Sequence, residues 1–215
     1  MTKERKVKII LGGTFNPVHY GHLRIAEEML NLFPKAEISL MPAAFPPHRS
    51  KPSASPEQRI AMLDLALTSS PQLQIDTREI EREEPSYSVV TLEQIRQEAK
   101  DSCLIFIMGT DAFAKLDSWY QWQKLLTLTN ILVIKRPGSG LPRKGPVAKL
   151  MTEQRLDDIS DLAKHQYGKI SYYQMPLLDI SSTYIRNQIK CGKSPRFLLP
   201  NDILDYIKQN HLYLN

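Results

Sequence analysis

Cysteine is scarce in this chain of 215 residues, which contains two. Cys103 and Cys191 lie far apart, with no CxxC pair and no zinc-ligand spacing, so neither a disulfide framework nor a zinc ribbon is expected. Long hydrophobic runs are also missing, because the longest, residues 104–108 and 131–134, are far too short to span a bilayer. Since no sustained apolar segment follows the charged N-terminal residues, we expect a cytoplasmic protein with no membrane partner.

The chain also lacks an extended run of one charge. Lysine and arginine outnumber aspartate and glutamate by 28 to 23, a formal net charge of +5. Basic and acidic side chains are interspersed in residues 78–84, and the nearest approach to a basic run, residues 3–8, is short. This mild surplus suits a small polyanion as well as it suits DNA.

What the sequence does contain is a regular alternation of apolar runs and helical patterns. Its length suits a single domain over residues 1–215, which should bury roughly 70–75% of the unfolded surface. Strands are predicted at residues 7–11, 36–41, 73–76, 104–108, 130–135 and 169–175. Helices are predicted at residues 23–33, 56–67, 88–99, 152–165 and 201–208, with one more opened by residues 179–183. This order predicts an α/β fold, doubly wound and Rossmann-like, with a mainly parallel sheet and helices on both faces.

The stretch GGTFNPVHYGH, from Gly12 to His22, lies between the first predicted strand and the first helix. Such strand-to-helix turns bind phosphates, because glycine lets the backbone approach the anion and the helix N-terminus points N–H groups at it. His19 and His22 fall on nearly one face of the opening helical turn, where either could donate to a phosphate chain. A plain tight turn with a capping histidine is the simpler alternative, and zinc is disfavoured by the lack of nearby cysteine or carboxylate ligands.

A second candidate anion site is the segment DISSTYIR near the C-terminus. Ser182 and Thr183 suit a helix N-cap, and Arg186 lies one turn further on, where its guanidinium could bind an anion. Capping alone and phosphate binding are equally compatible with these residues. Ligands in doubly wound folds bind at the carboxyl ends of strands, where this helix start, the Gly12–His22 turn, the proline-rich residues 42–49 and the Gly109-Thr110-Asp111 junction are all expected.

These motifs resemble a known family. GGTFNPVHYGH is similar to the G-x-F-x-P-x-H-x-G-H signature of the nucleotidyltransferase superfamily, and DISSTYIR resembles its ISSTxxR signature. More narrowly, PPHR, PSYSVVTL, MGTDAFAKLDSWYQWQKLL and KRPG resemble their counterparts in bacterial nicotinate-nucleotide adenylyltransferases. The resemblance covers nearly the whole chain and implies one nucleotidyltransferase domain.

The resemblance implies adenylyl transfer from ATP to nicotinate mononucleotide, with Mg²⁺ accompanying ATP, and gives deamido-NAD and pyrophosphate. It makes His19, His22 and Arg186 catalytic and implies no protein metal ligands. The residues implied to bind ATP are Gly12, Gly13, Thr14, Phe15, His19, His22, Gly109, Asp111, Ser182, Thr183 and Arg186. Those implied to bind nicotinate mononucleotide are Thr14, Phe15, His48, Ser88, Trp119 and Tyr120, with the Trp119 ring stacking on the pyridine and backbone N–H groups at Ser88 and Tyr120 taking its carboxylate.

Several readings stay open beside this one. A nicotinamide-mononucleotide or phosphopantetheine adenylyltransferase shares the histidine turn, and a non-catalytic nucleotide-binding or nucleic-acid-binding module belongs to a different class. A tRNA-synthetase fragment is disfavoured, because the ISST segment stands where a lysine-rich signature would be expected. The expected partners are ATP and nicotinate mononucleotide, without nucleic acid. A monomer is slightly favoured, whether Arg49 touches substrate stays open, and Trp122 is expected to serve packing.

Overall fold

The computed structural model describes residues 5–44, 52–82, 86–136, 138–176 and 178–214. Within them, a seven-stranded sheet has the order β3-β2-β1-β4-β5-β7-β6, and every neighbouring pair is parallel. The parallel α/β architecture predicted from the sequence is therefore confirmed. The strands are β1 (Val7–Gly13), β2 (Glu37–Pro42), β3 (Leu73–Ile75), β4 (Cys103–Gly109), β5 (Asn130–Ile134), β6 (Arg155–Leu156) and β7 (Ile170–Tyr173).

Helices cover both faces of the sheet, because successive strand residues point to opposite sides. In β4, Ile105 and Ile107 join a core cluster with α1, α2, α7 and α8, whereas Leu104, Phe106 and Met108 join a second cluster with α3, α5 and α6. The helices are α1 (Tyr20–Leu32), α2 (Pro56–Leu67), α3 (Ser88–Glu98), α4 (Thr110–Phe113), α5 (Leu125–Leu128), α6 (Pro146–Gln154), α7 (Ser182–Lys190) and α8 (Asn201–Gln209).

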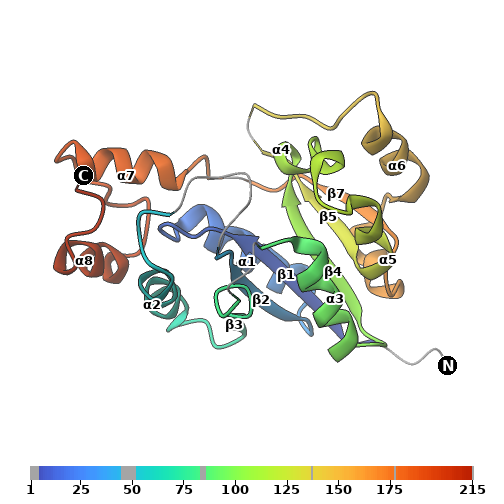
Figure 1. Cartoon of the computed structure of the whole chain (residues 1–215), viewed down its shortest axis with the longest axis horizontal. Coiled ribbons are helices and arrows are strands. Elements are labelled where there is room, and N and C mark those ends of the chain that lie inside the picture. The colour runs from blue at the N-terminus through green and yellow to red at the C-terminus, as the bar shows by residue number, and fades with distance from the viewer. Residues whose placement is uncertain (1–4, 45–51, 83–85, 137, 177, 215) are drawn as a thin grey trace.

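The strand order reverses between β1 and β4, which lie side by side at the centre of the sheet (Figure 1). Crossovers from β1 lead outward to β2 and β3, and those from β4 lead the other way to β5 and β7. Loops at such a switch point diverge and leave a crevice at the carboxyl ends of the strands. The turn from Gly12 to His22 leaves β1 there, and the Gly109-Thr110-Asp111 junction leaves β4 beside it.

The helix predicted at residues 152–165 is wrong. Helix α6 begins earlier, at Pro146, and ends at Gln154. The chain then pairs with β7 as the short strand β6, and Ser171 Oγ donates to the carbonyl of Leu156 at 3.1 Å. Asp158 next caps a 3₁₀ helix over Ile159–Lys164. The segment predicted as a polar helix pairs instead with the edge of the sheet, which offers it unpaired backbone groups.

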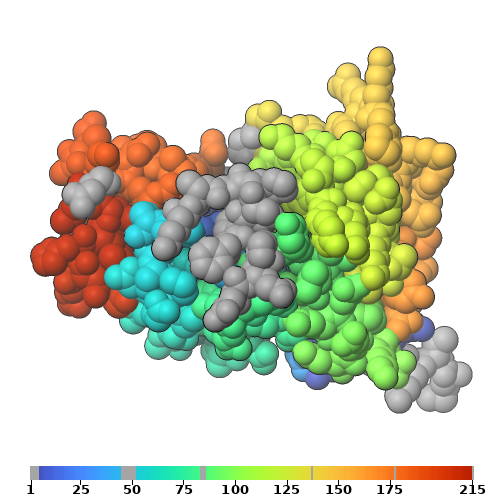
Figure 2. All heavy atoms as spheres, in the orientation of Figure 1, coloured from blue at the N-terminus to red at the C-terminus, as the bar shows by residue number. Residues whose placement is uncertain are grey.

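Helices α2, α7 and α8 gather at one end of the molecule, away from α5 and α6 (Figure 1). Helix α2 packs against α8, and the two lie in contact on the surface in Figure 2. Helix α2 starts with a complete capping box, in which Ser55 Oγ accepts from the Gln58 N–H and Gln58 Oε1 accepts from the Ser55 N–H. No helix among the described residues has the length and apolar character to cross a membrane.

Candidate active site

The turn after β1 is tightly packed against its own glycines. Phe15 has a left-handed φ of 49° and lies 1% exposed. Its ring fills the space beside Gly13, where a Cβ atom would come within 2.9 Å of Phe15 Cζ. A Cβ atom at Gly21 would similarly lie 3.0 Å from the His19 ring. A side chain at Gly13 or Gly21 would therefore force the buried Phe15 or His19 ring to move.

His19 and His22 stack on each other at the start of α1. Their ring centroids are 3.7 Å apart at an interplanar angle of 25°, and the edge of Phe15 meets the His22 ring at 4.9 Å. His19 is the N-cap residue of α1 and is 4% exposed. The Nδ1 atoms of both histidines are buried without a hydrogen-bond partner among the described residues. The pair thus presents two desolvated imidazoles at a helix N-terminus.

Burial makes both imidazoles hard to protonate. Desolvation, with the Arg136 charge adding to it, lowers the pKa of His19 from 6.5 to about 4. The pKa of His22 also lies well below its usual value, because desolvation acts together with the charges of His19 and Arg136. The free protein therefore carries two neutral imidazoles at neutral pH, each with one N–H to donate.

Helix α7 is joined to the histidine turn by two side chains. Ser182 Oγ donates to the Pro17 carbonyl at 2.9 Å, and Arg186 Nη1 donates to the Asn16 carbonyl at 2.7 Å. Arg186 Nη2 also contacts Thr183 Oγ1 at 3.2 Å, while Ser181 is the N-cap whose Oγ accepts from Tyr184. Segments 170 residues apart in sequence, at Asn16 and Arg186, thus form one edge of the site.

The end of β4 brings a further arginine to this edge. Asp111 Oδ2 lies 3.5 Å from Arg136 Nη1, and both side chains are 48% exposed. Thr110, which is fully buried, accepts the Arg136 N–H on its Oγ1 at 3.0 Å. Gly109 leaves room for both charged side chains, because a Cβ atom there would lie 2.5 Å from Arg136 Nε. Gly109 and Asp111 are therefore adjacent to the arginine whose charge acts on the histidines.

The aromatic segment reaches the turn through Phe106 of β4. A Cβ atom at Gly12 would lie 3.4 Å from the Phe106 ring, and the Trp119 ring meets Phe106 at 6.5 Å between centroids. Tyr120 is 51% exposed, and its ring lies 4.7 Å from that of Tyr87, the N-cap residue of α3. Ser88 is the first residue of α3. Trp122 packs against the second core cluster.

Not every predicted residue can be placed. His48 and Arg49 lie outside the described residues, so their predicted roles stay predictions. The site also contains residues that the motifs did not single out. Arg136 follows β5 in the KRPG segment, and its position at the carboxyl end of a strand was the available signal. Two buried side chains contact the turn from the core side: Arg59 binds the Thr14 carbonyl, and Tyr213 binds Asn16. The spacing of these residues in the sequence gives no sign of these contacts.

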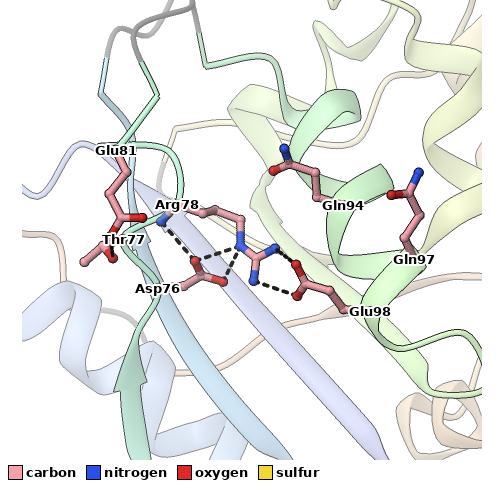
Figure 3. A pocket seen from close by; sticks show the side chains of 7 residues that line it. All are labelled: Asp76, Thr77, Arg78, Glu81, Gln94, Gln97 and Glu98. Atoms are coloured by element: carbon pink, nitrogen blue, oxygen red, sulfur yellow. Dashed lines mark hydrogen bonds and ion pairs between the residues drawn. The ribbon is translucent and has the colours of Figure 1, made fainter.

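A different hollow of the surface lies between the segment after β3 and α3 (Figure 3). Its arginine, Arg78, is already paired: Nε lies 2.8 Å from both Asp76 carboxylate oxygens, and Nη1 and Nη2 lie 2.9 and 3.0 Å from Glu98. The Arg78 guanidinium is thus fully paired with carboxylates. The histidine turn and the serine-rich start of α7 lie elsewhere, at the switch point.

Comparison with known proteins agrees with the family that the sequence motifs resemble. The model of the cytidylyltransferase-like family matches residues 10–188, so the chain is a nucleotidyltransferase of that class. A protein of Acidithiobacillus ferrooxidans named "Probable nicotinate-nucleotide adenylyltransferase" is 41% identical over 208 residues, which cover 95% of this chain and 94% of that protein. One of the same name from Cellvibrio japonicus is 42% identical over 205 residues, covering 95% and 97%. The chain belongs to the nicotinate-nucleotide adenylyltransferase family.

Solved structures support the fold. A structure of Plasmodium falciparum nicotinic acid mononucleotide adenylyltransferase complexed with NaAD superposes with a TM-score of 0.75 at 17% identity, over 97% of this chain and 98% of that one. The parallel sheet with its switch point is therefore shared with that enzyme.

Proposed function

We propose that this chain transfers the adenylyl group of ATP to nicotinate mononucleotide, as the names of its relatives indicate. The observation that carries the proposal is the joining of two anion-binding helix starts into one edge, through the Arg186 contact to the Asn16 carbonyl at 2.7 Å. A single helix N-terminus would suit many phosphates. Two that face one switch point suit a long polyphosphate and a second phosphate-bearing substrate.

In this reaction an oxygen of the mononucleotide 5′-phosphate bonds to the α-phosphorus of ATP. The bond from that phosphorus to the oxygen bridging to the β-phosphate breaks, and pyrophosphate leaves. The attacking phosphate has a second pKa near about 6, so it is already largely ionised at neutral pH and needs no general base. The work left to the protein is to align two anions and to stabilise charge on the transferring group.

The desolvated histidines suit that work. Neutral His19 and His22 donate N–H bonds to the triphosphate, and the bound anion then favours the protonated form of the pair. Arg186 binds the triphosphate from α7, with Ser182 and Thr183 beside it, while Gly109 and Asp111 face the adenosine side. Backbone of Gly12, Gly13, Thr14 and Phe15 lines the turn.

For the pyridine nucleotide we propose Trp119 as the stacking surface, with backbone at Ser88 and Tyr120 receiving the ring carboxylate. The contact between the Tyr87 and Tyr120 rings supports this grouping, because it brings the start of α3 to the aromatic segment. His48 belongs to the same proposal on the family resemblance. Acid rather than amide preference would follow from backbone N–H donors, which an anionic carboxylate accepts better than a carboxamide does.

Magnesium is proposed as a companion of ATP. No three histidine, cysteine or carboxylate side chains converge within the described ranges, so the donor set there does not form a cage of protein ligands. Mg²⁺ keeps several waters and commonly binds through substrate phosphates and one or two carboxylates. Asp111 is the carboxylate at the site that could contribute. When bound, the ion neutralises phosphate charge.

A cytoplasmic location stays a prediction from composition.

The test is product formation by the purified protein with ATP, Mg²⁺ and nicotinate mononucleotide. We expect pyrophosphate and deamido-NAD in equal amounts, quantified by chromatography and a coupled phosphate assay. Absence of turnover with both pyridine mononucleotides would remove the enzyme assignment. Faster turnover with phosphopantetheine would move the chain to that branch of the superfamily.

A further inference from the structure

Three buried polar side chains lie on the core side of the histidine turn: Arg59 of α2, Asn16 of the turn and Tyr213 near the C-terminus. Their exposed fractions are 1%, 5% and 8%. We call this set the turn brace. None of its members was singled out by the motifs, and the proposed chemistry does not use them.

Arg59 binds the backbone just beyond the ends of β1 and β2. Its Nη1 donates to the Thr14 carbonyl at 2.9 Å and to the Ala43 carbonyl at 2.6 Å. The Ala43 N–H in turn donates to the Gly13 carbonyl at 2.9 Å. In a trans peptide the carbonyl and the following N–H point in opposite directions. With the Thr14 carbonyl fixed on the core side by Arg59, the Phe15 N–H is directed away from the core.

Tyr213 and Asn16 extend the brace toward α7. The Tyr213 hydroxyl donates to Asn16 Oδ1 at 2.8 Å, and the Ala54 N–H donates to the same oxygen at 3.3 Å. Burial raises the pKa of Tyr213, which keeps its phenol a donor. The main-chain carbonyl of Asn16 is the acceptor for Arg186. The side chain of Asn16 is thus bound to Tyr213, while its backbone carbonyl holds Arg186, the side chain proposed to bind the triphosphate.

The charge of Arg59 is costly where it lies. Its Nε is buried without a hydrogen-bond partner among the described residues, and its two hydrogen bonds go to the backbone carbonyls of Thr14 and Ala43. Burial lowers the pKa of this guanidinium. A buried cation that binds only carbonyls is expensive, whereas a neutral side chain of similar volume would not be. Helix packing alone does not account for a guanidinium at this position.

We propose that Arg59 and Tyr213 are positioning residues for the phosphate-binding turn, Arg59 by orienting the Thr14–Phe15 peptide and Tyr213 by fixing Asn16 beneath Arg186. This inference rests on the proposed function for the identity of the ligand, ATP. Neither side chain touches the ligand in this account. Arg59 acts through the Phe15 N–H, and Tyr213 acts through Asn16 on the Arg186 guanidinium. The buried positive charge of Arg59 adds to the field that attracts the triphosphate.

The test uses Arg59→Lys and Tyr213→Phe, of which the second removes one oxygen. Lysine keeps the charge but is one bond shorter than arginine, so its ammonium falls short of the position from which Arg59 Nη1 donates to both carbonyls. The readout is the dissociation constant of α,β-methylene ATP, measured by calorimetry well below the melting temperature. We expect each variant to weaken binding about three- to tenfold. Loss of stability alone would reduce the amount of folded protein, and so kcat, without changing this constant.

Arg96→Lys is the matched control. Arg96 also holds carbonyls with its guanidinium, those of Leu128, Ser102 and Gln166, but these precede β5, β4 and β7 at the opposite edge of the sheet. It should lower the melting temperature and leave analogue binding unchanged. Binding within twofold of wild type in both Arg59→Lys and Tyr213→Phe would overturn the proposal, as would equal weakening in Arg96→Lys. If Arg59→Lys does not fold, Tyr213→Phe decides by the same limits.

The two proposals fail in different ways. If wild-type protein binds the analogue but forms no dinucleotide, the proposed function fails and the brace can still be measured. If the wild type turns over and the brace variants match it in both affinity and KM for ATP, only the inference about Arg59 and Tyr213 fails.

Discussion

The two stacked imidazoles are the most unusual residues of this molecule. Centroids 3.7 Å apart in a desolvated setting leave no room for two positive charges, since like charges at that separation repel strongly. The pair therefore titrates as a unit and takes up at most one proton easily. In the proposed function, the triphosphate of ATP supplies the negative charge that the pair lacks.

Replacing His22 by alanine tests this role. The variant should lower kcat about 10²- to 10³-fold, because a preorganised donor to developing charge is lost, while pyridine-nucleotide binding changes little. Steady-state kinetics with both substrates measures it. His165→Ala serves as a control, since His165 precedes β7 at the far edge of the sheet. Normal turnover of His22→Ala would exclude the charge-stabilising role.

The depressed pKa of His19 has a consequence for stability. Its pKa is about 4 in the folded protein and 6.5 when unperturbed, so the unfolded chain binds more protons between these values. The contribution of neutral His19 to the free energy of unfolding is thus fully present above about pH 6.5 and is lost as the pH falls toward 4.

The measurement is an NMR titration of the His19 ring in the free protein, paired with melting temperatures of wild type and His19→Asn from pH 7 to 4. We expect an apparent midpoint near 4 and a steeper loss of stability in the wild type. A midpoint near 6.5 would show that the ring is solvated and charged as in a peptide.

Trp119 offers a test of the pyridine side. The Trp119 ring contacts the Phe106 ring, and the Phe106 ring lies against Gly12. Phe106 is thus the side chain that separates Trp119 from the turn. Trp119→Ala should raise KM for nicotinate mononucleotide about tenfold through lost stacking and leave KM for ATP nearly unchanged. Trp122→Ala is the comparison, because both tryptophans pack on the second core cluster and Trp119 is the one whose ring meets Phe106. An unchanged KM in Trp119→Ala would remove this residue from the site.

Helix α7 is linked to the turn by hydrogen bonds from Ser182 and Arg186. Arg186 binds the Asn16 carbonyl and Thr183 at once, which requires two nitrogens of a planar guanidinium. Arg186→Lys keeps the charge and loses this fork. We expect kcat/KM for ATP to fall about ten- to a hundredfold, with the fold intact by circular dichroism.

The exposed Arg155 of β6 provides the control for that variant, because it lies on the edge strand of the sheet and pairs with Asp157. Arg155→Lys should leave kcat/KM unchanged. Equal activity of Arg186→Lys and wild type would mean that the link from α7 to the turn carries no catalytic weight.

Elements defined by local signals were predictable from the sequence. The helix starts predicted at residue 56 and at residues 179–183 match α2 and α7, whose N-cap residues are Ser55 and Ser181. The apolar run at residues 104–108 marked the buried strand β4. Segment 155–164 was not predictable, since its conformation depends on pairing with β7 rather than on its own periodicity. Local chemistry fixes element starts, whereas edge pairing is decided by the rest of the fold.

At the scale of the whole molecule, the site is made by topology. The turn after β1 and the junction after β4 are neighbours because these two strands pair at the reversal of the sheet order. Motif order and the resemblance placed the histidines, Arg186 and Trp119 at one edge. The brace of Arg59, Asn16 and Tyr213 could not be foreseen, because contacts between residues up to 197 apart leave no local pattern.

Our proposal is that the site at the carboxyl ends of β1 and β4 catalyses the joining of ATP to the acid form of the mononucleotide. It is tested most directly by measuring kcat/KM for nicotinate and nicotinamide mononucleotide side by side, with ATP and Mg²⁺ saturating. We expect dinucleotide from nicotinate mononucleotide, with a kcat/KM at least about tenfold above that for the amide, because a carboxylate accepts charge-assisted hydrogen bonds. Equal rates, or a faster amide, would contradict it.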